Sequence, residues 1–292
     1  MTINTSLIKE LREATGAGMM ECKKALEEAE GNLETALTII RKAGHAKAAR
    51  KVNRIACEGI ITIKTSPDHK KAIMIEINCE TDFAAKDHSF LEFVDTIANQ
   101  SLNEQIMDLK SFIALPSVAE MQENLIAKIG ENVTIRRLKM MVIDGEGMIS
   151  NYLHGNRIGV LVKLSLANAE LGKDLAMHIA ACSPIAIGPE SLPQTLIDKE
   201  KEIYFAQLQN SNKSQEVLAK IVAGRIQKFI NESVLVKQPF VKNPELLVED
   251  LLQKFHLHII DFTRFEVGEG IEKKMTDFVS EVEAQIKTKK DL

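Results

Sequence analysis

The chain contains 292 residues, of which 45% are hydrophobic and 27% are charged, and its formal net charge is -4 at pH 7. This composition indicates a folded globular protein of two or three domains and excludes a disordered or collagen-like chain. The small negative charge and the aromatic content of 4%, with no tryptophan, argue against general binding to phosphate backbones or single-stranded bases. We therefore expect no specific nucleic-acid partner.

Cysteine usage and hydropathy indicate the cellular compartment. The four cysteines are widely spaced and form no CxxC pair, unlike the cysteines of a secreted disulfide framework. The first residues lack the basic and then apolar pattern of a signal peptide. The longest apolar stretch, residues 175–189, is shorter than the roughly 20 residues that span a bilayer. These features predict a cytoplasmic protein with reduced thiols and no membrane partner.

Residues 1–53 are predicted to form a small bundle of three short helices followed by a basic linker. Apolar residues recur at helical spacing through this region, and the glycine-containing segment 15–18 separates the first two helices. Gly31 is placed to end the second helix. Asn32 is a good N-cap for the third helix, which we expect to stop near Gly44.

Residues 41–54 form a basic segment, because lysines and arginines occur there with no acidic residue between Glu34 and Glu58. Three interpretations remain open. The segment could be a solvated linker helix, or a basic face that meets an acidic partner surface. RNA or ribosome binding ranks third, because no aromatic residues lie between the charges to stack on bases.

Residues 54–144 are predicted to form the first of two similar α+β units, the N-subdomain of a core. Alternating segments on either side of a Ser-Pro-Asp-His turn predict a β-hairpin over 59–79. A helix follows with Asp87 as its N-cap. A second helix begins at a capping box over 117–120 and ends at Gly130, before a further strand.

The pattern then recurs, since Glu-Gly-Ile-Ile at 58–61 resembles Glu-Gly-Met-Ile at 146–149. The second copy is predicted to contain a hairpin and a helix over 175–181, so residues 145–267 form the C-subdomain of the core. The first copy has extra residues around 81–85, between its hairpin and its helix. A segment that one copy has and the other lacks is a place where function is added to a repeat.

Residues 190–232 insert a helical hairpin into the second unit, and apolar stripes on both arms predict an antiparallel coiled coil. Asn243 and Pro244 are expected to cap a later helix, and a strand is expected over 257–267. Residues 268–292 are expected to form a C-terminal helical module, with an apolar face made of Phe278, Val282 and Ile286.

No combination of residues predicts catalysis, a cofactor or a resident metal. Gly-Ala-Gly at 16–18 and Gly-Glu-Gly at 268–270 lack the rest of a phosphate-binding loop and of a dinucleotide fingerprint, so we expect no direct nucleotide binding. Two histidine-containing pairs could each supply two metal ligands, but a structural zinc site needs four. Four nearby carboxylates are better explained by an N-cap and a solvated loop. These sets are His178 with Cys182, His256 with His258, and Glu76, Glu80, Asp82 and Asp87.

Phe83 is unusual because it is a large apolar residue among Thr, Asp, Ala and Lys. One interpretation is a side chain that folds back onto its own subdomain. The other is an apolar wedge that the loop presents to a partner. The sequence alone leaves both interpretations open.

Motifs along nearly the whole chain resemble the translation elongation factor Ts family. They are Thr-Gly-Ala-Gly-Met-Met at 15–20, Cys-Lys-Lys-Ala-Leu at 22–26, Asn-Cys-Glu-Thr-Asp-Phe at 78–83, Lys-Ile-Gly-Glu-Asn at 128–132, His-Gly-Asn-Arg-Ile-Gly-Val at 154–160 and Arg-Phe-Glu-Val-Gly-Glu-Gly at 264–270. The resemblance implies an α+β fold with a ubiquitin-associated-like (UBA-like) N-terminal bundle, a core of two subdomains and a protruding coiled coil.

The resemblance also implies a guanine-nucleotide exchange factor for elongation factor Tu rather than an enzyme. In the family, a Thr-Asp-Phe-Val motif enters the G domain of the partner and helps to dislodge its Mg²⁺. That motif corresponds here to Thr81, Asp82, Phe83 and Ala84, and the last position departs from the usual valine. The resemblance places a second set of residues at the partner interface: Met19, Met20, Lys23, Lys51, Ile129, Gly130, Asn132 and His154.

Overall fold

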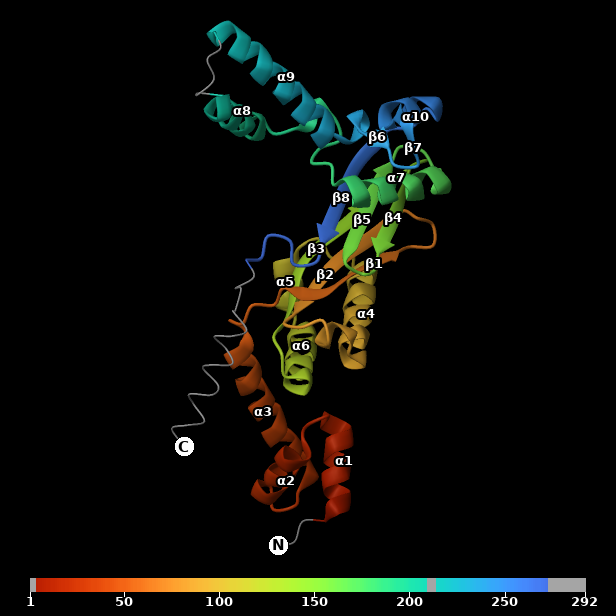
Figure 1. Cartoon of the computed structure of the whole chain (residues 1–292). Coiled ribbons are helices and arrows are strands. Elements are labelled where there is room, and N and C mark those ends of the chain that lie inside the picture. The colour runs from red at the N-terminus through yellow and green to blue at the C-terminus, as the bar shows by residue number, and fades with distance from the viewer. Residues whose placement is uncertain (1–3, 209–213, 273–292) are drawn as a thin grey trace.

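The computed structural model describes residues 4–208 and 214–272, without the side chains of 45–49, and has the predicted α+β architecture (Figure 1). Two three-stranded antiparallel sheets pack face to face in the middle of the molecule. Helices cover the outer face of each sheet. The N-terminal helices project from one end, and a helical hairpin projects from the other.

The three predicted N-terminal helices are present and share a small core that contains Leu11 and Leu26. Gly16 follows the first helix in the left-handed conformation, with a φ of 66°. Asn32 caps the third helix as predicted, because its side chain accepts a hydrogen bond from Thr35 N at 3.0 Å. The helices are α1 Thr5–Thr15, α2 Met19–Glu28 and α3 Leu33–Lys51.

Helix α3 does not stop near Gly44, so that prediction is wrong. It continues to Lys51 and carries most of the basic segment. A Cβ atom at Gly44 would lie 3.2 Å from the Cβ of Ala127 in the core. The absence of a side chain therefore lets α3 approach the core closely, and this packing offsets the low helix propensity of glycine.

The first sheet has the strand order β1-β2-β3, and its outer face packs against helices through Ile75, Phe90 and their neighbours. Asp87 caps the helix after the hairpin, as predicted, by accepting a hydrogen bond from Ser89 N at 2.8 Å. The elements are β1 Glu58–Thr65, β2 Lys71–Cys79, the 3-10 helix η1 Ala84–Lys86, α4 His88–Asn103, α5 Leu109–Ile113, α6 Pro116–Ile129 and β3 Val133–Val142.

The second sheet, with the order β4-β5-β8, repeats this arrangement. Residues 165–168 precede its helix, whereas 80–87 precede α4, so the predicted surplus in the first copy is confirmed. The helix begins earlier than the predicted residue 175, because Asn168 accepts a hydrogen bond from Leu171 N at 3.1 Å. The elements are β4 Met148–His154, β5 Ile158–Leu164, α7 Ala169–Cys182, α10 Val248–Lys254 and β8 Ile259–Glu266.

The two sheets meet through a third apolar cluster that includes Met74, Leu161 and Phe265. Gly159 lies at this contact, where a Cβ atom would come within 2.5 Å of Ile61 Cγ2 and 2.7 Å of Met74 Sδ. A side chain at this position would therefore push the sheets apart. Close packing fixes one sheet relative to the other, and it also fixes the loops at their shared edge.

Two helices form a hairpin in the second half, and its packing as a coiled coil stays a prediction. Its two helices lie antiparallel, since Arg225 Nη1 donates a hydrogen bond to Gln207 Oε1 at 3.0 Å and the base packs through Leu196 and Phe229. Residues 209–213, with most of the predicted turn, lie outside the described residues, and so do 273–292 with the predicted terminal helix. The elements are η2 Pro189–Ser191, α8 Gln194–Leu208, α9 Gln215–Ser233 and η3 Leu235–Lys237.

Two further predicted helix starts are wrong. Helix α6 begins at Pro116 with Leu115 as its N-cap, so residues 117–120 lie inside the helix and form no capping box. The fixed φ and missing N–H of proline suit a first helical position. Residues Asn243–Leu247 form strand β7, paired with β6 Pro239–Phe240, and the next helix begins only at Val248.

Candidate functional site

The loop between β2 and α4 presents an apolar side chain to solvent. Phe83 is 80% exposed, whereas Ala84 and Ala85 directly after it are buried in the core of the first sheet. The interpretation in which Phe83 folds back onto its own subdomain is therefore wrong. The loop is anchored on one side of Phe83 by buried alanines and on the other by strand β2.

Glu131 holds the start of this loop. Its Oε2 accepts hydrogen bonds from Glu80 N at 3.1 Å and Thr81 N at 2.9 Å, and its Oε1 accepts one from Thr81 Oγ1 at 2.7 Å. The Thr81 hydroxyl in turn accepts a hydrogen bond from Ala84 N at 3.2 Å. Glu131 is not among the interface residues predicted from the sequence, although a carboxylate directly after the helix-ending Gly130 was an available signal.

Asp82 lies beside Phe83 and is exposed to solvent. A hydrogen bond from Lys86 Nζ, at 2.7 Å, lowers the pKa of Asp82, and the charge of Arg157 acts in the same direction. Asp82 is therefore ionised near neutral pH. Its carboxylate could accept hydrogen bonds from a partner or repel other anions.

The turn between β4 and β5 lies at the same edge of the molecule as this loop. Ile61 N donates a hydrogen bond to Asn156 O at 2.8 Å, and Arg157 forms an ion pair with Glu58 at 2.8 Å. Glu58 pairs with Cys79 at the end of β2, immediately before the Phe83 loop. The sheet packing thus brings together two motifs, at 78–83 and 154–160, that are far apart in the sequence.

His154 projects from this turn. It is exposed, its ring stacks on Tyr152 with centroids 6.2 Å apart, and its Nδ1 lies 3.2 Å from the Tyr152 hydroxyl. The contacts with Tyr152 limit the directions in which the imidazole can point. His154 is therefore a surface group on the edge that also carries Phe83.

The N-terminal bundle carries a separate exposed group at the start of α2. Met19 is 59% exposed and Met20 is 64% exposed, and the Lys23 side chain beside them lies 3.9 Å from Glu27. Exposed methionines adapt their shape to a partner surface more readily than branched residues do. These three residues are therefore free of the core and oriented outward.

Four other predicted interface residues lie where the bundle joins the core. Lys51 Nζ donates a hydrogen bond to Gly130 O, and the neighbouring Ile129 is half-buried. Asn132 is only 4% exposed, and its Nδ2 donates hydrogen bonds to the carbonyls of residues 52 and 54 at 3.3 and 2.8 Å. The side chains of Lys51 and Asn132 thus make contacts within the chain.

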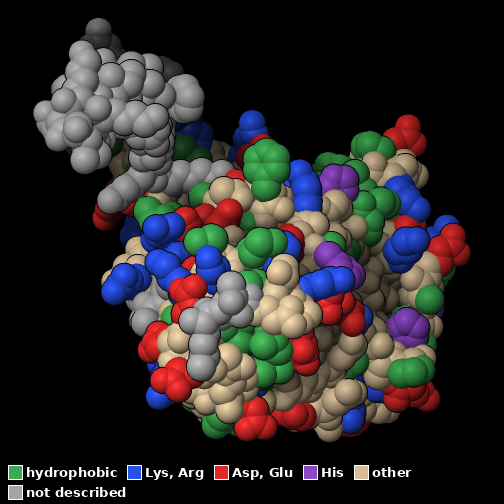
Figure 2. Space-filling model, turned by 90° about the horizontal axis from the view of Figure 1, so that it is seen from below, with side chains coloured by type: hydrophobic (Ala, Val, Ile, Leu, Met, Phe, Trp, Pro, Cys, Tyr) green, Lys and Arg blue, Asp and Glu red, His purple; other side chains and the backbone are tan. Residues whose placement is uncertain are grey.

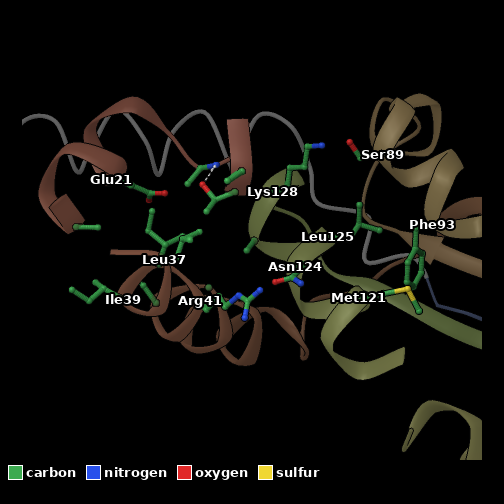
Figure 3. A pocket seen from close by; sticks show the side chains of 18 of the residues that line it. Glu21, Leu37, Ile39, Arg41, Ser89, Phe93, Met121, Asn124, Leu125 and Lys128 are labelled. Atoms are coloured by element: carbon green, nitrogen blue, oxygen red, sulfur yellow. Dashed lines mark hydrogen bonds between the residues drawn. The ribbon is translucent and has the colours of Figure 1, made fainter. Parts of the chain in front are cut away.

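A groove of about 660 Å³ lies beside this junction, between the bundle and the outer helices of the first sheet (Figure 3). Leu37 of α3 lines one side, and Phe93, Met121 and Leu125 of α4 and α6 line the other. The bundle therefore rests on the core along α3 and α6 and leaves an apolar recess next to that contact.

Two basic residues at the end of the basic segment make contacts within the chain. Lys51 is bound to Gly130, and Arg54 lies 3.5 Å from Glu80. Basic, acidic and apolar side chains are interspersed on the face seen in Figure 2.

The candidate metal ligands are not gathered into a metal site in the described ranges. No three or more His, Cys, Asp or Glu side chains are grouped there to hold a metal ion. His178 is buried, which lowers its pKa, and its ring contacts Gln238 Oε1 at 3.0 Å and accepts a hydrogen bond from Val241 N at 3.2 Å. His256 and His258 both precede β8, which begins at Ile259 rather than at the predicted residue 257.

Glu76 is buried rather than placed in a solvated loop, so that interpretation is wrong for this carboxylate. It accepts hydrogen bonds from Arg136 Nη1 at 2.9 Å, Arg137 Nε at 2.5 Å and Gly268 N at 2.8 Å. These bonds tie the segment after β8 to the first sheet.

In the part of the chain that the structure describes, no helix combines the length and the apolar character needed to cross a bilayer.

Comparisons with known proteins agree with this arrangement of motifs. A family model described as "Elongation factor TS" matches residues 80–269, which include the Phe83 loop and the His154 turn. The chain is 48% identical to an elongation factor Ts of Thioalkalivibrio sulfidiphilus over 98% of this chain and 99% of that protein. The corresponding proteins of Methylococcus capsulatus and Legionella pneumophila are 48% and 47% identical, over 98% of this chain and 99% of each relative.

Proposed function

Because this chain belongs to the elongation factor Ts family, we propose that it is a guanine-nucleotide exchange factor for elongation factor Tu. It binds the GDP form of that partner, promotes the loss of Mg²⁺ and then of GDP, and leaves when GTP binds. The matches span 98% of this chain, so the proposal rests on nearly all of the given sequence.

The exposed Phe83 is the observation that carries this proposal. An aromatic side chain that is 80% exposed gains almost nothing for the folded state, yet it is held on an anchored loop beside an ionised Asp82. This combination suits insertion into an apolar pocket of a partner, with a carboxylate placed next to a metal or phosphate site. Within this motif we assign insertion to Phe83 and the carboxylate to Asp82, while Thr81 and the buried Ala84 hold the loop on either side.

The thermodynamic basis of exchange is reciprocal coupling. Mg²⁺ neutralises the phosphates of the nucleotide in the partner, so a protein that favours the metal-free pocket weakens nucleotide binding. The same factor by which it weakens nucleotide affinity is the factor by which nucleotide weakens its own binding. A coupling of about 4 kcal/mol corresponds to roughly a thousandfold change in affinity.

The remaining exposed groups provide binding energy around the wedge. Met19, Met20 and Lys23 form one contact from the bundle, and His154 forms another from the edge that carries Phe83. Contacts spread in this way would hold the partner while the loop acts on its nucleotide pocket.

The test is release of fluorescent GDP from elongation factor Tu by stopped flow, with and without this protein. We expect acceleration that saturates with protein concentration and that weakens as Mg²⁺ is raised. Unchanged release at saturating protein would contradict the proposal. Strongly salt-dependent binding of ribosomal RNA in the same preparation, without exchange, would instead favour the RNA- or ribosome-binding interpretation of residues 41–54.

A further inference from the structure

The carboxylate of Glu131 holds the loop that carries the wedge through both of its oxygens. It accepts hydrogen bonds from two backbone amides and one hydroxyl, those of Glu80 and Thr81, at 2.7 to 3.1 Å. An ionised carboxylate is well suited to this task, because its two oxygens accept several hydrogen bonds and its charge strengthens each of them. An apolar residue would leave three donors without these partners.

Phe83 depends on such bonds for its position. With 80% of the residue exposed, the ring has little packing against its own chain, so its location is set by the backbone beneath it. That backbone is fixed by buried Ala84 on one side and by Thr81 on the other. Thr81 is itself oriented by Glu131, since its hydroxyl donates to the carboxylate and accepts from Ala84 N at 3.2 Å.

The residues on either side of Glu131 connect this loop to the bundle. Gly130 O accepts the hydrogen bond from Lys51, and Asn132 Nδ2 donates to the carbonyls of residues 52 and 54. Asn132 N also donates to Glu80 Oε1 at 2.7 Å, which returns to the start of the loop. One three-residue segment, 130–132, thus holds both the end of α3 and the base of the wedge.

We propose that Glu131 is a positioning residue for nucleotide exchange, which fixes the backbone at Glu80 and Thr81 so that Phe83 is presented in the orientation that the partner's pocket requires. This rests on the proposed function. Glu131 itself need not touch the partner. A pre-ordered loop avoids the entropy cost of ordering the wedge during binding, and this raises the saturating rate of GDP release.

The test is a double-mutant cycle of Glu131→Ala and Phe83→Ala, read as GDP release from elongation factor Tu across a range of exchange-factor concentrations. We expect Glu131→Ala to lower the saturating rate about tenfold when Phe83 is present and less than about twofold when Phe83 is already alanine. Glu131→Gln, which keeps one acceptor oxygen, should fall between Glu131→Ala and the wild type. Glu120→Ala, an exposed carboxylate change on α6, is the matched control and should have no effect.

A second measurement uses the free protein and so does not depend on the proposed function. In Glu131→Ala, amide hydrogen exchange should speed up at Glu80, Thr81 and Ala84 while remaining unchanged at Ile75 in the middle of β2. Equal rate losses with and without Phe83, or unchanged exchange at the loop amides, would overturn the positioning role. If the wild type does not accelerate GDP release, the proposed function fails, and the amide measurement still decides whether Glu131 orders the loop.

Discussion

Substitution of Phe83 by alanine separates folding from function. The residue is 80% exposed, so its removal takes almost no apolar surface out of the folded core. Surface changes of this kind alter the free energy of unfolding by less than about 0.5 kcal/mol. We therefore expect the free variant to keep the melting temperature and circular dichroism spectrum of the wild type.

The expected functional loss follows from the area that the ring would bury in a partner. Burial of about 150 Å² of an aromatic side chain corresponds, at about 25 cal/mol per Å², to about 4 kcal/mol. Truncation of a central aromatic anchor costs about 2 kcal/mol or more in measured interfaces. If 2 kcal/mol is lost from the step that opens the nucleotide pocket, GDP release slows about 30-fold.

The assay is stopped-flow release of fluorescent GDP from elongation factor Tu at several Mg²⁺ concentrations, together with affinity for the nucleotide-free partner. Because the wedge acts on the nucleotide-bound state, release should fall much more than the affinity for the nucleotide-free state. Phe255→Ala is the control, since Phe255 is 44% exposed and directly follows α10, a helix that packs on the second sheet. Unchanged release in Phe83→Ala would remove the wedge from the mechanism.

Three further outcomes follow from other parts of the molecule. Deletion of residues 1–52 should weaken complex formation, measured by calorimetry, but leave the core folded, because the bundle has its own apolar cluster; equal affinity would show that the bundle does not bind the partner. His154→Ala should weaken binding with little change in melting temperature, whereas a large fall would make this exposed residue structural. Burial alone would raise the pKa of Glu76, but hydrogen bonds from Gly268, Arg136 and Arg137 lower it below 4.5. The ionised Glu76 therefore stabilises the folded state above pH 4.5, and this contribution is lost as the pH falls through the folded pKa. Glu76→Gln should therefore cost about 3 kcal/mol of unfolding free energy at pH 7 and progressively less below pH 4.5 in denaturant titrations; a difference that does not vary with pH would contradict this.

The elements with local signals were predictable from the sequence. Asn32 and Asp87 cap their helices through hydrogen bonds to residues two or three positions ahead. Gly130 ends α6 in the left-handed conformation, with a φ of 84°, that glycine adopts easily. The repeated hairpins were visible because strand alternation and turn residues lie within short segments. Each of these features depends on interactions between near neighbours in the chain.

The surplus segment of the first repeat was also visible in the sequence, but the environment of its residues was not. Whether Phe83 faces solvent depends on whether its own subdomain offers a pocket, and packing against distant residues decides that. The same holds for Glu76, whose partners come from β3 and from the segment after β8. The carboxylate of Glu76 is thus buried and hydrogen-bonded, whereas that of Asp82 is exposed to solvent.

Tertiary contacts decided the features on which the proposed function depends. The full length of α3 required close approach of Gly44 to Ala127, and propensity alone favoured an earlier end. The common edge shared by the loop at 80–84 and the turn at 154–157 required two sheets to pack through Gly159. The support given by Glu131 to Thr81 spans residues that are 50 positions apart. Sequence patterns report the propensities of neighbouring residues, whereas these contacts exist because burial of apolar surface brings distant segments together and leaves their polar groups to find partners there.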